Sequence, residues 1–316
     1  MKDNSPYYIV LVADEGYVQH AGVMLTSLFE HNSDKDFRVY LLTDGISEMS
    51  QDRLTTLCRH YGGELRVCLC SEDGLEELPV GQWSTMMYYK LFMPVMLPRE
   101  AERCLFLDVD MVVNDDIEPL YHFDLQGRVL AAAEDMPDCV HIKPRIGLEQ
   151  TDLYVNSGVM VCDLVRWREM EAVQPIFAFV RSVADRIVNE QDVIALYFRG
   201  RIGVLPIRWN MVTFYFNRVP KIFPKYLPEL AEAKRNPGIV HFCAPIKPWF
   251  CDSQHPYRSL YRHYLRLYGQ AAGCAVNLRF PYGEQLTPRQ RVNKTIRNFL
   301  NRIGLMRDAG YTPGVK

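Results

Sequence analysis

Apolar runs and amphipathic stretches alternate regularly through the first part of this chain, and this alternation limits the fold more than any other feature. A continuous apolar run occupies 7–13 and is typical of a strand covered on both faces. Strand patterns also occupy 37–43 and 64–70, and stretches with helical spacing of apolar residues occupy 20–30 and 47–60. Strands joined by short helical crossovers form a parallel sheet with right-handed connections. We therefore predict an α/β fold with a Rossmann-like beginning.

No G-x-G-x-x-G follows the first strand, so the fingerprint of dinucleotide binding is absent. Ser47 is placed to cap the second helix. Further along, the patterns predict helices over 85–97, 164–170, 174–188 and 191–198, strands over 128–134 and 158–163, and an ordered loop over 205–228.

The bulk composition excludes some functions and locations. The chain has 316 residues and a formal net charge of −2, which gives no global basic field for nucleic acid. Nine cysteines, mostly within apolar runs and without a C-x-x-C pair, suggest buried free thiols rather than disulfides or a zinc site. The sequence shows no secretory signal and no apolar stretch that would span a bilayer, so we expect a cytoplasmic protein.

Two carboxylates interrupt an apolar strand pattern at Leu105–Val113, where Asp108 and Asp110 stand two residues apart. In extended geometry both side chains would point to the same face of the strand. Their mutual repulsion and lost hydration would be relieved by Mg²⁺ or Mn²⁺, which favour oxygen ligands. The alternative is a strand that ends at Asp108, with Asp110 in a turn.

Seven ordered blocks extend this observation: VADEGY, YYKLFMP, LFLDVDMVV, YVNSGVMVCDL, NEQDV, LPIRWN and HFCAPIKPW. Together they resemble the retaining glycosyltransferases of family eight, which include bacterial lipopolysaccharide galactosyl- and glucosyltransferases and glycogenin. The resemblance covers 7–252. It implies a GT-A type nucleotide-sugar-binding domain with a mixed central sheet, and a uridine diphosphate sugar as the donor.

The resemblance also assigns metal and nucleotide ligands. It implies that Asp108, Asp110 and His241 bind the metal; an imidazole in the set favours Mn²⁺, although Mg²⁺ also fits. Without that context His241 would be a core histidine. Further contacts with the nucleotide sugar are implied for a larger group, namely Ala13, Asp14, Lys90, Val109, Asn156, Ser157, Ala244 and Lys247.

Ala13 and Asp14 match the uracil and ribose positions, and Lys247 matches a diphosphate ligand. Simpler interpretations are a turn or cap for Asp14 and a surface lysine for Lys247. Two departures stand out: Lys90 replaces a common Arg and so loses the bidentate fork, and Ala244 replaces a common Gly.

Donor-sugar contacts are implied for Asp135, Asn156 and Asp192, and Gln191 matches the position beneath the anomeric carbon. Asn-Ser-Gly at 156–158 would also suit a turn, and Glu-Gln-Asp at 190–192 would suit a helix cap. Two routes give retention: attack by Gln191 or a nearby carboxylate through a covalent intermediate, or attack by the acceptor from the leaving-group face. An amide is a poor nucleophile, which favours the second route.

We therefore predict a Mn²⁺-dependent enzyme that moves galactose or glucose from UDP-galactose or UDP-glucose to a glycan or glycolipid acceptor, such as lipopolysaccharide or another cell-surface polysaccharide. The alternative from another class is a sugar-nucleotide-binding protein without transfer activity. A nucleotidyltransferase would need a basic phosphate loop near the first strand, where this chain has Asp14-Glu15-Gly16.

The expected organisation is a GT-A domain over 1–286 and a basic tail over 287–316. Within the tail, apolar residues fall on one helical face and Arg or Lys residues largely on the other. Such a helix could contact an anionic membrane through 287–307, or pack on the main domain with a solvated basic face.

Overall fold

The computed structural model describes residues 5–71, 74–81, 84–217, 219–245, 247–251 and 253–277. The predicted tail at 287–316 lies outside these described residues. No helix in the described ranges is long and apolar enough to cross a membrane.

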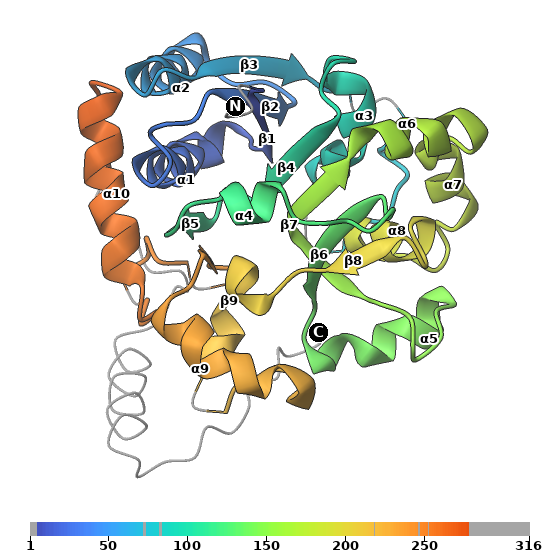
Figure 1. Cartoon of the computed structure of the whole chain (residues 1–316). Coiled ribbons are helices and arrows are strands. Elements are labelled where there is room, and N and C mark those ends of the chain that lie inside the picture. Colours follow the sequence, from blue (N-terminus) through green and yellow to red (C-terminus); the bar gives the residue numbers. More distant parts are fainter. Residues whose placement is uncertain are drawn as a thin grey trace, which may run out of the picture.

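A large mixed sheet of seven strands forms the centre of the molecule (Figure 1). Its strand order is β3-β2-β1-β4-β7-β6-β8. The bounds are β1 Tyr7–Val12, β2 Phe37–Thr43, β3 Glu64–Leu69, β4 Arg103–Leu107, β6 Leu130–Glu134, β7 Val155–Asp163 and β8 Ile202–Val204. Strands β1 to β4 are parallel, and β7 runs antiparallel to both β4 and β6. The predicted fold class, including the mixed sheet, is confirmed.

A second, small sheet lies beside the first and has the order β5-β10-β9. Its strands are β5 Met111–Val113, β9 Met211–Val212 and β10 Ile239–His241. Strand β10 pairs antiparallel with β5, so that His241 lies opposite Met111. This sheet therefore brings together three segments that are widely separated in the sequence.

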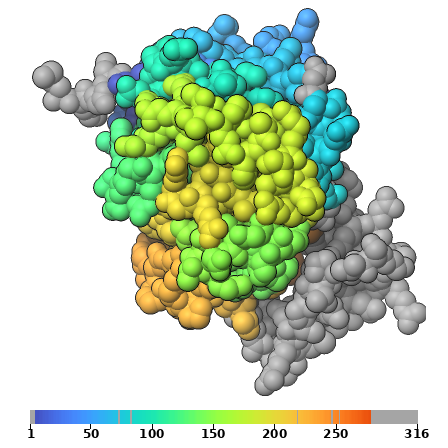
Figure 2. Space-filling model, turned by 90° about the vertical axis from the view of Figure 1, so that its right-hand side faces the viewer, coloured from blue at the N-terminus to red at the C-terminus, as the bar shows by residue number. Residues whose placement is uncertain are grey.

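Helices cover both faces of the large sheet. Their bounds are α1 Val18–Glu30, α2 Glu48–His60, α3 Met93–Met96, α4 Glu118–Tyr121, α5 Ile142–Ile146, α6 Leu164–Val173, α7 Ile176–Ser182, α8 Glu190–Tyr197, α9 Leu227–Arg235 and α10 Arg258–Ala271. Helices α1, α2 and α10 cover one face, whereas α3, α6, α7 and α8 cover the other. Figure 2 shows the middle of the chain, including α6 and α7, covering its side of the molecule.

Two hydrophobic cores follow from the alternation of side chains along the strands. On β4, Leu105 and Leu107 belong to the core beneath α1 and α10, whereas Cys104 and Phe106 belong to the opposite core. All four side chains are fully buried. The nine cysteines are unbridged, as the sequence predicted.

The predicted helix over 85–97 is not continuous. A 3₁₀ helix occupies Thr85–Phe92 and the short helix α3 follows it. Pro94 stands in the first turn of α3, where its missing N–H costs nothing, so this position favours a new helix start over a continued one.

The helix predicted over 174–188 is also too long, because α7 ends at Ser182. The Val188 N–H donates to the Asp192 carboxylate instead of a helical carbonyl.

The segment predicted as a loop at 205–228 contains 3₁₀ turns and strand β9. The predicted cap of α2 by Ser47 is confirmed, because its side chain accepts a hydrogen bond from the Ser50 N–H.

Candidate functional site

The two aspartates of the interrupted strand lie where the chain crosses from the large sheet to the small one. Strand β4 ends at Leu107 and β5 begins at Met111, so the extended geometry expected over Asp108–Asp110 is not present. The Asp108 N–H donates to the Gly158 carbonyl at 2.8 Å, and the Asp110 carbonyl accepts from the Phe242 N–H at 2.9 Å. The bend is therefore held by one hydrogen bond to β7 of the large sheet and one to the residue that follows β10.

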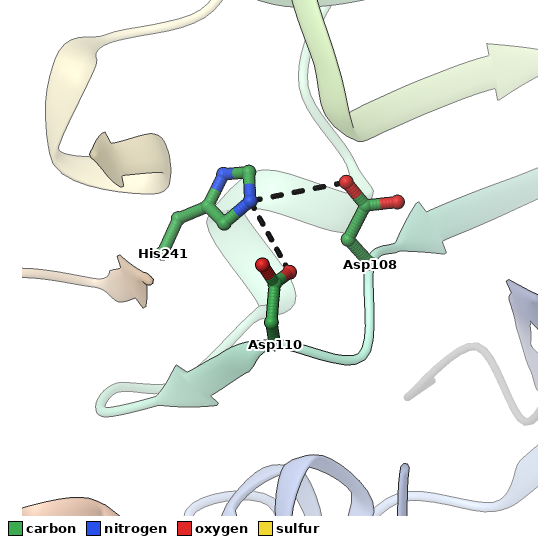
Figure 3. A group of neighbouring side chains, drawn as sticks. All are labelled: Asp108, Asp110 and His241. Carbon is green, nitrogen blue, oxygen red and sulfur yellow. Dashed lines mark ion pairs between the residues drawn. The ribbon is translucent and has the colours of Figure 1, made fainter. Parts of the chain in front are cut away.

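His241 brings its imidazole to both carboxylates at this bend (Figure 3). Its Nε2 atom lies 3.3 Å from Asp110 Oδ1 and 3.8 Å from Asp108 Oδ2. One ligand atom from each of the three residues lies within 4.8 Å of the others. Two carboxylates and one imidazole are a donor set for a divalent transition ion, Mn²⁺ among them.

Gly158 on β7 leaves the space in which this group assembles. A Cβ atom at that position would lie 2.6 Å from His241 Cε1 and 2.8 Å from Asp108 Oδ2. Distances this short are not found for real Cβ atoms, so any side chain would displace His241 or Asp108. From the sequence, Gly158 was expected at the start of a strand or in a turn before it. The residues at this bend fit a divalent cation, both in their chemistry and in the room left for it.

Lys247 lies on the other side of Asp110. Its Nζ donates to Asp110 Oδ2 at 2.6 Å and to the Phe242 carbonyl at 2.8 Å. Burial would raise the pKa of Asp110, but Lys247 and His241 outweigh it and hold that pKa well below its usual range. The cleft thus keeps Asp110 ionised and presents a lysine beside it.

Lys90 forms a second, more deeply buried cationic group in this cleft. Its Nζ donates to Glu190 at 2.9 Å, to Ser157 at 3.2 Å and to Asp108 at 3.4 Å. Burial would lower the pKa of Lys90, but Asp108 and Glu190 outweigh it and raise that pKa. Burial itself raises the pKa of Asp108. Glu190, which the sequence placed in a cap motif, makes the shortest of the three contacts of Lys90.

Gln191 is held by hydrogen bonds at both ends of its amide. Its Nε2 donates to Asp135 Oδ2 at 2.6 Å, and its Oε1 accepts from the Ser157 N–H at 3.2 Å. Asp135 also accepts from the Met136 N–H, and burial raises the pKa of its carboxyl. The cap of α8 is supplied by Asn189 rather than by Gln191.

These groups line one cleft of about 820 Å³ at the ends of β1, β4 and β7. That volume suits a ligand with several ring-sized parts. Of the residues predicted from the sequence, those that line it are Ala13, Asp14, Lys90, Asp108, Val109, Asp110, Asp135, Asn156, Ser157, Gln191, His241 and Lys247. Asp14 also caps the turn after β1 by accepting from the Tyr17 N–H at 2.9 Å.

Strand β7 begins earlier than predicted, so Asn156 and Ser157 lie within it rather than in a turn before it. The pairing of β6 with β7 shifts register here, from Ala132 opposite Met160 to Ala133 opposite Asn156. This irregularity leaves Ser157, Gly158 and Val159 outside the pairing with β6. Such bulges commonly direct side chains toward an active site.

Two predicted residues do not line the cleft, namely Asp192 and Ala244. Asp192 is fully buried, and its carboxylate accepts from Arg145, from the Tyr154 hydroxyl and from the Val188 N–H. These bonds fix the start of α8 and leave the carboxylate facing away from the cleft. Ala244 follows Cys243, which does line it.

The fold and sequence can be compared with known proteins. The chain is 27% identical over 274 residues to general stress protein A of Bacillus subtilis, covering 84% of this chain and 95% of that protein. It is 27% identical over 258 residues to the lipopolysaccharide 1,2-glucosyltransferase of Escherichia coli K12, covering 79% and 74%. The solved structure of the galactosyltransferase LgtC with donor and acceptor sugar analogs has a TM-score of 0.70 at 23% identity, covering 91% and 99%. The family model for glycosyl transferase family 8 matches residues 8–252, and the chain therefore belongs to this family.

Proposed function

We propose that this protein transfers galactose or glucose from a UDP-sugar to a glycan or glycolipid, with retention at the anomeric carbon and with Mn²⁺ as its metal. The observation that carries the proposal is the convergence of Asp108, Asp110 and His241 in a large polar cleft beside Lys247. The diphosphate of a nucleotide sugar is negatively charged. A divalent ion held by the first three residues, together with Lys247, would offset that charge. The named activities of the relatives, a glucosyltransferase and a galactosyltransferase, support the same class of donor.

The nucleotide end of the cleft is assigned to Ala13 and Asp14, which line it at the end of β1. Ligands of parallel sheets bind at the carboxyl ends of the strands, in agreement with this placement. Lys247 would bind the diphosphate as it leaves. A divalent ion held by Asp108, Asp110 and His241 would supply further positive charge to the leaving phosphate oxygens.

The sugar end is assigned to Asp135, Asn156, Lys90 and Gln191. Both ends of the Gln191 amide are already engaged, by Asp135 and by the Ser157 backbone. These bonds fix the amide and occupy its oxygen, the atom that would attack, which favours a positioning role for Gln191 over nucleophilic attack. We favour attack by the acceptor from the leaving-group face, with a phosphate oxygen accepting its proton. A trapped sugar adduct on 190–192 of the unmodified enzyme would contradict this route.

We further propose that a tail begins after residue 286 and that 287–307 contacts anionic membranes. A glycolipid acceptor would place the enzyme at the inner membrane face, where a basic amphipathic helix binds anionic lipid. Deleting the chain after Thr287 should abolish binding to anionic vesicles and spare transfer to a soluble acceptor. Unchanged vesicle binding would favour a tail packed on the main domain.

The test of the proposed function measures UDP release from a panel of UDP-sugars, with Mn²⁺ and with EDTA. Release of UDP from one donor, dependent on Mn²⁺, is the expected result. Asp108→Asn should remove most of this activity, because it weakens one of three metal ligands, whereas the exposed Asp52→Asn should retain it. A donor that binds with Mn²⁺ but is never cleaved, even with added acceptors, would instead support a binding protein without transfer activity.

A further inference from the structure

A buried asparagine that lies outside the cleft joins the metal-ligating histidine to a residue of the sugar end. Asn210 has no exposed surface and is not among the residues that line the cleft. One end of its side-chain amide lies 2.9 Å from His241 Nδ1, and the other end lies 2.8 Å from Asn156 Oδ1. Each link has a defined hydrogen-bond direction.

The direction is fixed by a backbone N–H, which can only donate. The Gly158 N–H donates to Asn156 Oδ1 at 3.2 Å, so this end of the Asn156 side chain is its oxygen. Asn210 must therefore donate to Asn156 through its Nδ2 atom. It follows that the Asn210 oxygen faces His241, and that His241 donates its Nδ1–H to this oxygen.

This hydrogen-bond chain determines which nitrogen of His241 is free. A neutral imidazole that carries its proton on Nδ1 has a lone pair on Nε2, the atom that faces Asp108 and Asp110. A metal-ligating histidine needs that lone pair, and its other ring nitrogen usually donates to a fixed acceptor. At the same time, Asn210 and Gly158 hold the oxygen of Asn156 and leave its NH₂ group as the end available to the cleft.

We infer that Asn210 is a positioning residue that sets the tautomer of His241 and the orientation of Asn156 together, so that the metal end and the sugar end of the cleft are aligned by one buried amide. The inference rests on the proposed function for the identity of the two ends. It adds a residue that touches neither the metal nor the sugar.

Two substitutions separate the two connections of Asn210. Asn210→Leu removes both, so we expect the Mn²⁺ affinity to fall by about 10- to 100-fold, as for other outer-shell partners. Asn210→Asp keeps an acceptor for His241 Nδ1–H but cannot donate to Asn156. We expect this variant to hold Mn²⁺ within a few-fold of the wild-type affinity and to bind the UDP-sugar more weakly.

The matched control is Asn32→Leu. Asn32 is also almost fully buried and also uses both ends of its amide, donating to the Leu28 carbonyl and accepting from the Ile117 N–H. It lies outside the cleft lining. A purely structural role for Asn210 predicts the same behaviour for both leucine variants: lower stability and unchanged Mn²⁺ affinity.

The experiment measures Mn²⁺ affinity by titration and the tautomer of His241 by ¹⁵N NMR of histidine-labelled protein, with His241→Gln to assign the signal. In its neutral form the wild-type ring should carry its proton on Nδ1 before metal is added. A neutral ring that carries its proton on Nε2, or a wild-type Mn²⁺ affinity in Asn210→Leu, would overturn the inference. If Asn210→Leu does not fold, unchanged UDP-sugar binding by Asn210→Asp would overturn it. Neither readout requires transfer, so an inactive protein with this tautomer and intact Mn²⁺ binding would contradict only the proposed function.

Discussion

The large sheet and the small sheet differ in how far apart their neighbouring strands lie in the sequence. Strands β1, β2 and β3 of the large sheet follow one another through single helices. In the small sheet, β10 lies between β5 and β9, although more than a hundred residues separate Val113 from Ile239. The first sheet supplies most of the core, and the second supplies His241, the third member of the candidate metal group.

This difference has a physical cause. Long apolar strands bury enough surface to be specified by their own pattern, whereas strands of two or three residues are stabilised only by what surrounds them. The chemistry of the site depends on the junction between the sheets, where Asp108 bonds to β7 and Asp110 bonds to the segment after β10. Substitutions at the junction should therefore affect activity more than stability, and substitutions in the helical layer should do the reverse.

The largest expected effect comes from filling the space at that junction. Gly158→Ala would force His241 or Asp108 away from the positions seen here, because the new Cβ would overlap both. A misplacement of about 1 Å near the chemistry costs on the order of 10²-fold in rate. We expect at least this loss in UDP release, together with weakened Mn²⁺ binding in titrations.

Gly203→Ala is the matched control, because Gly203 also lies on a strand of the large sheet and its Cβ would meet Ala131 Cβ at 3.2 Å. That variant should lose some stability and keep its affinity for Mn²⁺. Equal Mn²⁺ affinity in the two variants would show that the space beside His241 is not required by the metal site.

The sequence predicted the large sheet well because each strand and helix carries its own periodic pattern. It left open whether the strand continues through Asp108–Asp110 or ends at Asp108, and the structure has the break. The apolar run gave no sign that its second half joins another sheet. The resemblance assigned Asp108, Asp110 and His241 to one metal site, but it did not show which strands place them close together. Gly158 and Asn210 were inside the quoted blocks, but a missing side chain and a buried amide have no signal of their own in one sequence.

Asp192 illustrates the opposite error. The resemblance implied a contact between Asp192 and the donor sugar, yet neighbouring residues on a helix point in different directions. Gln191 lines the cleft, and Asp192 faces the interior, where Arg145 and Tyr154 bind its carboxylate. Only the direction of each side chain separates the two, and that direction depends on where α8 begins.

A second, smaller effect concerns the layer that covers the small sheet. The ring of His20 on α1 stacks on the ring of Trp249, with 3.6 Å between the two ring centroids. Its Nδ1 atom is hydrogen-bonded to the Tyr261 hydroxyl at 2.6 Å. Burial lowers its pKa from 6.5 to about 4. Between these pH values the unfolded chain binds a proton that the folded protein does not, so stability is full above pH 6.5 and falls toward pH 4. The loss is about 3 kcal/mol.

His20→Phe keeps a ring against Trp249 and removes the titration. Urea unfolding at several pH values should therefore show a shallower fall in the free energy of unfolding for this variant. The exposed His263→Gln should follow the wild type. His255, whose pKa is also lowered to about 4 by burial, leaves a remaining dependence of the same sign. Parallel curves for His20→Phe and the wild type would contradict this origin of the acid sensitivity.

The smallest expected effect concerns the packing of α10 against α1, two helices that cover the same face of the large sheet. Gly22 on α1 lets Tyr268 of α10 approach so closely that a Cβ would lie 2.3 Å from the tyrosine ring. Gly22→Ala should therefore destabilise the protein by about 1–3 kcal/mol through overpacking. Metal binding should not change, because this contact lies outside the cleft lining.

A double-mutant cycle with Tyr268→Leu shows whether the loss comes from this one contact. The shorter side chain removes the ring that the alanine would strike, so the double variant should be more stable than the sum of the single losses predicts. Strict additivity would place the cost of the alanine elsewhere in α1. A loss of Mn²⁺ affinity in Gly22→Ala would mean that the packing of α1 against α10 positions the small sheet. Substitutions in the helical layer would then affect the site as well as stability, against the contrast drawn above.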